Sequence, residues 1–184
     1  MRSLFGLLAI LVASPAFAQS QPPIYPDSSL TAGMIDERLT PRYLCSHSAQ
    51  DRRGVTQSLA NQVFAAYRVD YADHSAYEVD HFIPLFLGGV NRCSNSPTCN
   101  LWPEPHQRQF PQIAPWGSET KDLLEGVLYR TMCPVKNGIR RAAQDVQWLR
   151  QAQSAMMRDW RAAYRDYICR DPQGKTANAL AVCR

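Results

Sequence analysis

Beyond its first residues, the chain contains no hydrophobic run long enough to cross a bilayer, which argues against a membrane-embedded domain. No two cysteines have the C-x-x-C spacing of a zinc knuckle. Internal repeats are absent, and no base-reading nucleic-acid module is recognisable. These absences favour a single globular domain and argue against sequence-specific recognition of DNA.

The first residues have the pattern of a secretory signal peptide. Residues 1–18 contain one positive charge at Arg2, an apolar run over 4–12, a helix-breaking Pro15 and a small-x-small cleavage site. The apolar run is too short for a membrane anchor. The sequence therefore predicts a mature chain that begins at Gln19, is secreted or periplasmic, and has no membrane contact after cleavage.

All six cysteines follow this segment, and an even number in an exported chain favours disulfides over a thiolate metal site. Our hypothesis pairs Cys45 with Cys133 across the core, Cys93 with Cys99 in one loop, and Cys169 with Cys183 near the C-terminus. Local spacing alone supports the last two pairs.

The remaining sequence divides into three parts. Residues 19–42 are rich in proline and read as an extended leader, 43–169 as one mostly helical α+β domain, and 170–184 as a C-terminal tail. The formal net charge of +4 suits a polyanionic partner without requiring one.

Apolar residues at helical spacing predict three helical regions in the domain. The first runs from an N-cap at Thr56 to Arg68, and the second from a cap at Ser118 to about Met132. Residues 139–169 contain no glycine or proline and predict one long helix or two in succession. This last region is basic, which usually marks a solvated face but could contact a nucleic-acid backbone.

The stretch from Glu78 to His106 organises the rest of the chain. A strand begins at Tyr77, Gly88-Gly89 permits a tight reversal, and a returning segment starts at Asn100 and halts at Pro103 and Pro105. This order predicts a hairpin.

Asp80 and His81 lie at the end of the first strand, where adjacent side chains would normally point to opposite faces. Pro84 discourages regular pairing beyond them, so the two side chains could converge on one site. The alternative is a buried structural pair in which the two groups satisfy each other.

The runs EVDHFIPLFLGG and NLWPEP resemble the HNH endonucleases, whose ββα-metal fold binds one divalent cation between a hairpin and a helix. The closer resemblance is to small exported bacterial HNH-like proteins, which have a similar Lys-Asp-x-x-Glu helix, here Lys121-Asp122-Leu123-Leu124-Glu125. It covers about residues 43–167. The resemblance implies a ββα-metal core, stapled here by disulfides, and phosphodiester hydrolysis in DNA or RNA with low sequence specificity.

The chemistry of the matching residues agrees with this expectation. A neutral imidazole at His81 suits a general base near pH 7, and the Asp80 carboxylate suits a hard divalent cation, first of all Mg²⁺, with Mn²⁺ or Zn²⁺ as alternatives. By resemblance, Asn100 holds the hairpin and orients the base.

The chain departs from the HNH pattern at the remaining metal ligand, because the second helix begins without the expected His or Asn. His106 could substitute if its loop folds back, and Glu119, Asp122 or Glu125 could serve instead. The departure keeps a second hypothesis open: a non-catalytic, disulfide-stabilised binding protein of the cell envelope that retains the scaffold. Trp102 is expected in the core and Lys121 in solvent, and the oligomeric state stays open.

Overall fold

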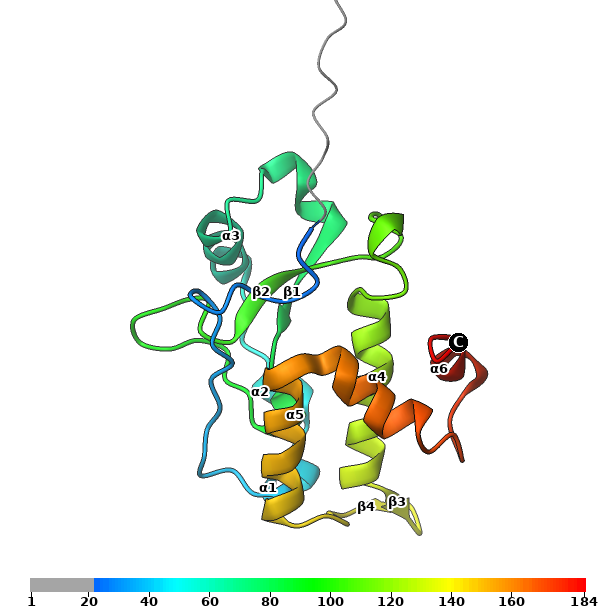
Figure 1. Ribbon diagram of the computed structural model, residues 1–184. Helices are drawn as coiled ribbons and strands as arrows, with labels where there is room; N and C mark the ends of the chain where they lie inside the picture. The colour runs from blue at the N-terminus through cyan, green and yellow to red at the C-terminus, as the bar shows by residue number, and fades with distance from the viewer. Residues whose placement is uncertain (1–21) are drawn as a thin grey trace, which may run out of the picture.

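The centre of the fold is an antiparallel hairpin (Figure 1). The computed structural model describes residues 22–184, so the expected signal peptide lies outside the described residues. Strand β1, Tyr77–His81, pairs with β2, Leu101–Pro105, and places Asp80 opposite Trp102. The predicted first strand is confirmed. Strand β2 continues through Pro103, because half of the N–H groups of an edge strand point away from its partner.

Helix α3, Gln57–Ala66, packs on one face of the hairpin. Its N-cap is Thr56, as predicted, and the Thr56 Oγ1 accepts a hydrogen bond from the Leu59 backbone N at 3.2 Å. The buried residues shared by helix and hairpin are Leu59, Val63, Phe64, Val79 and Leu101. This small cluster fixes the face to which odd-numbered residues of β1 point.

The opposite face contributes Trp102 to a larger core with α4, Ser118–Met132, and α5, Val146–Tyr164, which pack against each other. Trp102 is fully buried, as expected. The prediction that Ser118 caps α4 is wrong: Gly117 is the N-cap residue, and the Ser118 Oγ contacts the His106 ring instead.

The region predicted as continuous helix from 139 starts later. Val135–Lys136 (β3) and Ile139–Arg140 (β4) form a small hairpin around Asn137-Gly138, both of which have positive φ. Helix α5 is interrupted at Asp159, whose backbone is extended, and continues into a π-helical turn η4, Arg165–Cys169. The alternative of two helices in succession is therefore the better description.

Short elements complete the chain: α1 Pro41–Ser46, α2 Ala49–Arg52, η1 Tyr71–Ala76, η2 Leu85–Leu87, η3 Pro111–Ile113 and α6 Ala177–Ala181. The proline-rich segment that precedes α1 is held along the β1–β2 connection, where the backbone N–H groups of Gly33 and Met34 both donate to the Cys99 carbonyl. No described helix is long and apolar enough to span a membrane.

All three predicted disulfides are present: Cys45–Cys133, Cys93–Cys99 and Cys169–Cys183. The first joins α1 to the end of α4 across 88 residues, and the second closes a short loop between β1 and β2. Disulfides are typical of oxidising compartments. The fold is thus a mixed α/β domain with two small sheets and three disulfides.

Candidate functional site

The connection between β1 and β2 is held by one buried amide. The Asn100 Oδ1 accepts from the Ile83 backbone N at 2.8 Å, and its Nδ2 donates to the carbonyls of Ile83 and Val90, each at 2.9 Å. Gly89 must be glycine, because a Cβ there would lie 1.8 Å from the Ile83 carbonyl oxygen. Asn100 therefore fixes the loop that follows His81, while the His81 ring has a different partner.

That partner is Asn91. The His81 Nε2 lies 3.1 Å from the Asn91 Oδ1, which also accepts from the Gly54 backbone N at 2.9 Å. The Asn91 Nδ2 donates to the Arg52 carbonyl at 2.7 Å. These two backbone groups define the orientation of the Asn91 amide. If the amide were reversed, its NH₂ group would meet the Gly54 N–H and its oxygen would meet the Arg52 carbonyl, and neither pair could form a hydrogen bond.

The orientation of Asn91 determines the His81 tautomer. Because Oδ1 can only accept, Nε2 carries the hydrogen and Nδ1 is left with its lone pair. Burial lowers the pKa of His81 to about 4, against an opposing contribution from the Asp80 charge. The imidazole is therefore neutral at pH 7, with Nδ1 as the atom that can take a proton.

Asp80 faces α4 and forms an ion pair with Lys121, whose Nζ lies 2.5 Å from the Asp80 Oδ2. The same ammonium contacts Glu125 and lies 3.6 Å from the Glu104 Oε2. The Lys121 side chain is 1% exposed, so the expectation of a solvated lysine is wrong. Burial alone would lower its pKa, but the carboxylates of Asp80, Glu125 and Glu104 hold it well above its ordinary value.

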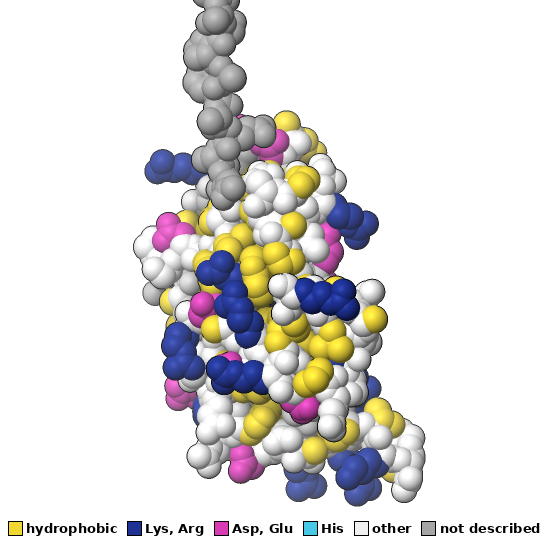
Figure 2. Space-filling model, turned by 45° about the vertical axis from the view of Figure 1, so that its right-hand side comes forward, with side chains coloured by type: hydrophobic (Ala, Val, Ile, Leu, Met, Phe, Trp, Pro, Cys, Tyr) yellow, Lys and Arg dark blue, Asp and Glu magenta, His cyan; other side chains and the backbone are white. Residues whose placement is uncertain are grey.

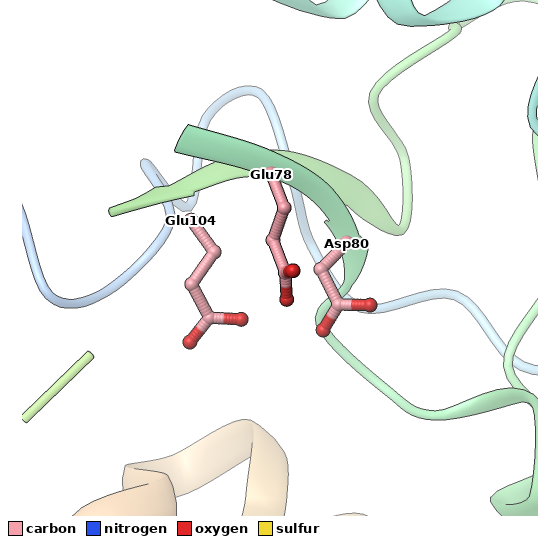
Figure 3. A group of neighbouring side chains, drawn as sticks. All are labelled: Glu78, Asp80 and Glu104. Carbon is pink, nitrogen blue, oxygen red and sulfur yellow. The ribbon is translucent and has the colours of Figure 1, made fainter. Parts of the chain in front are cut away.

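Three carboxylates gather on this face of the hairpin. Glu78 and Asp80 are two positions apart on β1 and therefore point to the same face, and Glu104 lies opposite Glu78 on β2. One carboxylate oxygen of each residue lies within 4.8 Å of those of the other two. Figure 3 shows all three side chains projecting from the hairpin on the same side. This grouping follows from the two-residue period of a strand and from the register of the hairpin.

If all of these carboxyl groups were ionised, their negative charge would exceed what the single Lys121 ammonium can neutralise. Burial and the charges of Asp80 and Asp122 raise the pKa of Glu78 to about 7, and burial raises the pKa of Glu125 to about 8. Burial would likewise raise the pKa of Asp80, but Lys121 lowers it below its ordinary value. The group can therefore hold protons, or a further cation in their place.

Glu104 is the least satisfied member. Its side chain is 1% exposed, and neither carboxylate oxygen has a hydrogen-bond partner among residues 22–184. Burial raises its pKa well above the ordinary value. A buried carboxylate without a donor is costly, so Glu104 is suited to a proton or a metal ion.

Asp80 and His81 do converge, as the sequence suggested. Both line one cavity of about 100 Å³, which is also lined by residues of α2 and η2 and by Glu125 of α4. Such a volume can hold roughly three water molecules. Arg53, just beyond α2, is exposed and lines the same cavity.

The structure does not bring His106 together with Asp80. His106 follows β2 at the far end of the hairpin, roughly 13 Å along the strand from the position opposite Asp80. Its Nδ1 lies 2.8 Å from the Ser118 Oγ. Of the other candidate ligands, Glu119 pairs with Arg108, whereas Glu125 reaches the cavity and Asp122 lines an adjoining groove.

Comparisons with protein-family models, curated proteins and solved structures find no match for this chain. Asn91, Glu78 and Glu104 were not predicted from the sequence as members of the site. Glu78 and Glu104 could have been found from strand alternation and hairpin register, since both share a face with Asp80. Asn91 lies in an irregular loop, where no periodicity predicts the direction of a side chain.

Proposed function

We propose that this protein is an exported, metal-dependent endonuclease that hydrolyses phosphodiester bonds in DNA or RNA with low sequence specificity, on an HNH-like ββα-metal core. The observation that carries the proposal is the shared cavity, in which the neutral His81 imidazole meets Asp80, one of three clustered carboxylates. The hairpin and the helix that contacts it, β1–β2 and α4, follow the order expected for such a core.

The residues present fit a hard divalent cation. Glu78, Asp80 and Glu104 offer three carboxylates, the donor type that Mg²⁺ and Mn²⁺ prefer and that Zn²⁺ also accepts. Neither carboxylate oxygen of Glu104 has a hydrogen-bond partner among the described residues, and only Oδ2 of Asp80 bonds to Lys121. A cation held there would stabilise negative charge on phosphoryl and leaving oxygens.

The chain's own residues would perform the proton transfer. His81 is neutral, and its Nε2–H is bonded to Asn91, which leaves Nδ1 to accept a proton from an attacking water. Asn91 keeps the ring in this tautomer, and Asn100 holds the loop that follows it. The Lys121 ammonium neutralises part of the carboxylate charge, which allows Glu78, Asp80 and Glu104 to lie close together.

Lys121 also supports a second candidate function. Its ammonium is bonded to two carboxylates and lies near a third, as a structural counter-ion would. A non-catalytic binding protein of the cell envelope, stabilised by its disulfides, would keep this arrangement without a metal ion. The two candidates differ in whether a divalent cation binds with useful affinity.

A nicking assay tests the proposal. Purified mature protein, with its start and its three disulfides checked by intact mass, is incubated with plasmid DNA and structured RNA in Mg²⁺, Mn²⁺ or Zn²⁺, and then with a chelator. We expect metal-dependent cleavage that falls about 10²–10⁴-fold in His81→Ala, the usual effect of losing a general base. We expect His81→Ala to keep its metal affinity and Asp80→Asn to lose both metal and activity. A His81→Ala protein that cleaves at the parent rate would refute the assignment.

A further inference from the structure

Five arginines lie in or directly beside α1, α2 and β4, and none of them has an acidic partner in the described part of the chain. They are Arg42, Arg52, Arg53, Arg140 and Arg141. α1, β3 and β4 lie at one end of the molecule (Figure 1), and Figure 2 shows basic side chains at that same lower end. The charge of such a group is neutralised either by ions in the solvent or by a bound anionic ligand.

In the basic α5 region, by contrast, several arginines already have partners. Arg150 donates to the Gln153 side chain and to the Glu37 carbonyl. Arg161 stacks over the Tyr25 ring, and Arg170 pairs with Asp166. These contacts occupy three guanidinium groups within the protein, whereas the side chains of Arg42, Arg53 and Arg141 form no hydrogen bond or ion pair among the described residues and keep their capacity for an external anion.

A groove lies between the candidate site and Tyr129, whose ring Arg140 contacts; its charged lining residues are Asp122 and Glu125. A depression of about 440 Å³ lies between α2, η2 and α4, and it shares Ala49, Gln50, Phe86 and Glu125 with the Asp80–His81 cavity. Its far wall is Tyr129, one turn beyond Glu125 on α4. The Arg140 guanidinium lies 4.7 Å from the centre of the Tyr129 ring and donates to the Cys133 carbonyl.

Beyond Arg140, a second depression of about 600 Å³ is lined by Arg42, Arg140 and Arg141. No acidic residue lines it; the others are Cys45, Ser46, Ile139 and Ala142. Arg52 of α2 lies near Tyr43 and Tyr129, and its buried Nε and Nη2 have no hydrogen-bond partner among residues 22–184. Its guanidinium stays charged when buried, which adds to the positive potential.

We propose that these two depressions form a binding track for the sugar-phosphate backbone of a nucleic-acid strand, which leads from Arg42 and Arg141 past Tyr129 to the Asp80–His81 cavity. The proposal rests on the proposed function for what happens at the cavity. Arginine forks match phosphate geometry, and an acidic site needs a basic surface nearby to retain a polyanion. Tyr129 lies one helical turn beyond Glu125, and the Arg140 guanidinium lies a further 4.7 Å from the Tyr129 ring. Arg140 is thus about 10 Å from Glu125, a span of roughly three phosphates along one strand.

Binding without turnover tests the track. A fluorescent oligonucleotide of about twelve nucleotides is titrated in chelator, and its affinity is measured by anisotropy over a range of salt concentrations. The variant is Arg42→Gln with Arg141→Gln, two exposed side chains whose loss leaves the Arg140–Tyr129 contact in place. The control is Arg38→Gln with Arg170→Gln, which removes the same charge from two arginines that are paired with carboxylates.

For the track variant we expect about tenfold weaker binding and a salt slope smaller by about 1.4–1.8, since each phosphate contact contributes about 0.7–0.9. The control should keep the parent slope. Equal affinities and slopes in the two double variants would overturn the track. So would binding to vesicles of an anionic phospholipid that depends on Arg42 and Arg141 when the oligonucleotide does not bind.

Cleavage separates this proposal from the proposed function. A dinucleotide has a single phosphodiester group, which occupies the cavity during cleavage and leaves no phosphate for Arg42. The track variant should therefore cleave it at the parent rate and cleave the longer oligonucleotide more slowly. If the parent cleaves both and the variant is unaffected on both, the track is refuted while the nuclease stands. If the parent cleaves neither, but binding depends on Arg42 and Arg141, the track stands and the nuclease is refuted.

Discussion

Replacing Lys121 by methionine would show how the acidic group is balanced. Methionine keeps an unbranched side chain of similar length but removes the ammonium that contacts Asp80 and Glu125 and approaches Glu104. These carboxyl groups would then be left in a buried site without their only lysine partner. The matched control is Lys136→Met on the exposed strand β3.

The magnitude follows from the burial of the pair. Removing one member of a buried ion pair typically costs about 3–5 kcal/mol, because the other charge stays buried and uncompensated. For a domain of this size, about 2–4 °C of melting temperature corresponds to each kcal/mol, so Lys121→Met should melt about 6–20 °C below the parent at pH 8. At pH 5 the loss should be smaller, because Glu78 and Glu125, with pKa values raised to about 7 and about 8, are then protonated.

The assay is a thermal melt of parent, Lys121→Met and Lys136→Met at pH 5 and pH 8, with and without Mg²⁺ or Mn²⁺. Removal of the internal cation should also increase the stabilisation by a divalent ion, since the ion then meets more unneutralised carboxylate. Equal melting temperatures for the two lysine variants at pH 8 would refute the reasoning. A loss that grows at pH 5 would do so as well.

Three further predictions follow from the same geometry. His106→Ala should leave metal affinity by calorimetry and the nicking rate unchanged, because the ring lies at the other end of the hairpin; a lost metal site would restore the sequence-based assignment. Gly89→Ala should lower the melting temperature strongly or prevent folding, whereas Gly138→Ala, with open space around it, should cost far less. Metal affinity should rise between pH 5 and pH 8, because a cation displaces the proton that burial keeps on Glu78; calorimetry in two buffers would detect the released proton, and a flat pH profile would contradict it.

The sequence predicted the parts of the fold that depend on local pattern. Strand β1, the Thr56 cap and the two short-range disulfides follow from alternation, capping chemistry and cysteine spacing. The Cys45–Cys133 pair, 88 residues apart, was predicted correctly but does not follow from local pattern. The small β3–β4 hairpin was missed although Asn137-Gly138 is a strong turn sequence, because the absence of glycine and proline beyond it suggested helix.

The candidate site was predictable only in part, because its organisation depends on tertiary contacts. Asp80 and His81 were identified from adjacent positions at a strand end, and they line one cavity. Lys121 was assigned to solvent, since helical periodicity places a lysine at the polar border of α4. The sequence around Lys121 does not show that β1 packs beside this side of α4. It is β1 that supplies the Asp80 carboxylate, and this ion pair makes burial of the Lys121 ammonium favourable.

The Asn91–His81 contact leads to a prediction that separates orientation from basicity. Asn91→Leu removes the acceptor for the His81 Nε2–H, so the ring should lose its fixed tautomer, and the nicking rate should fall by less than the effect of His81→Ala. Asn95→Leu, an exposed asparagine in the same connection between the strands, is the control.

The direct readout is ¹⁵N NMR of the His81 ring. In the parent, Nδ1 should be unprotonated and Nε2 protonated from pH 7 down to about pH 5, because burial lowers the pKa of His81 to about 4. His81 is buried in its neutral form, so protonation opposes folding. Its contribution to the free energy of unfolding is complete above the unfolded-state pKa of about 6.5 and is lost as the pH falls through about 4. A parent spectrum with the proton on Nδ1, or a ring that titrates near pH 6.5, would refute both the tautomer and the role assigned to Asn91.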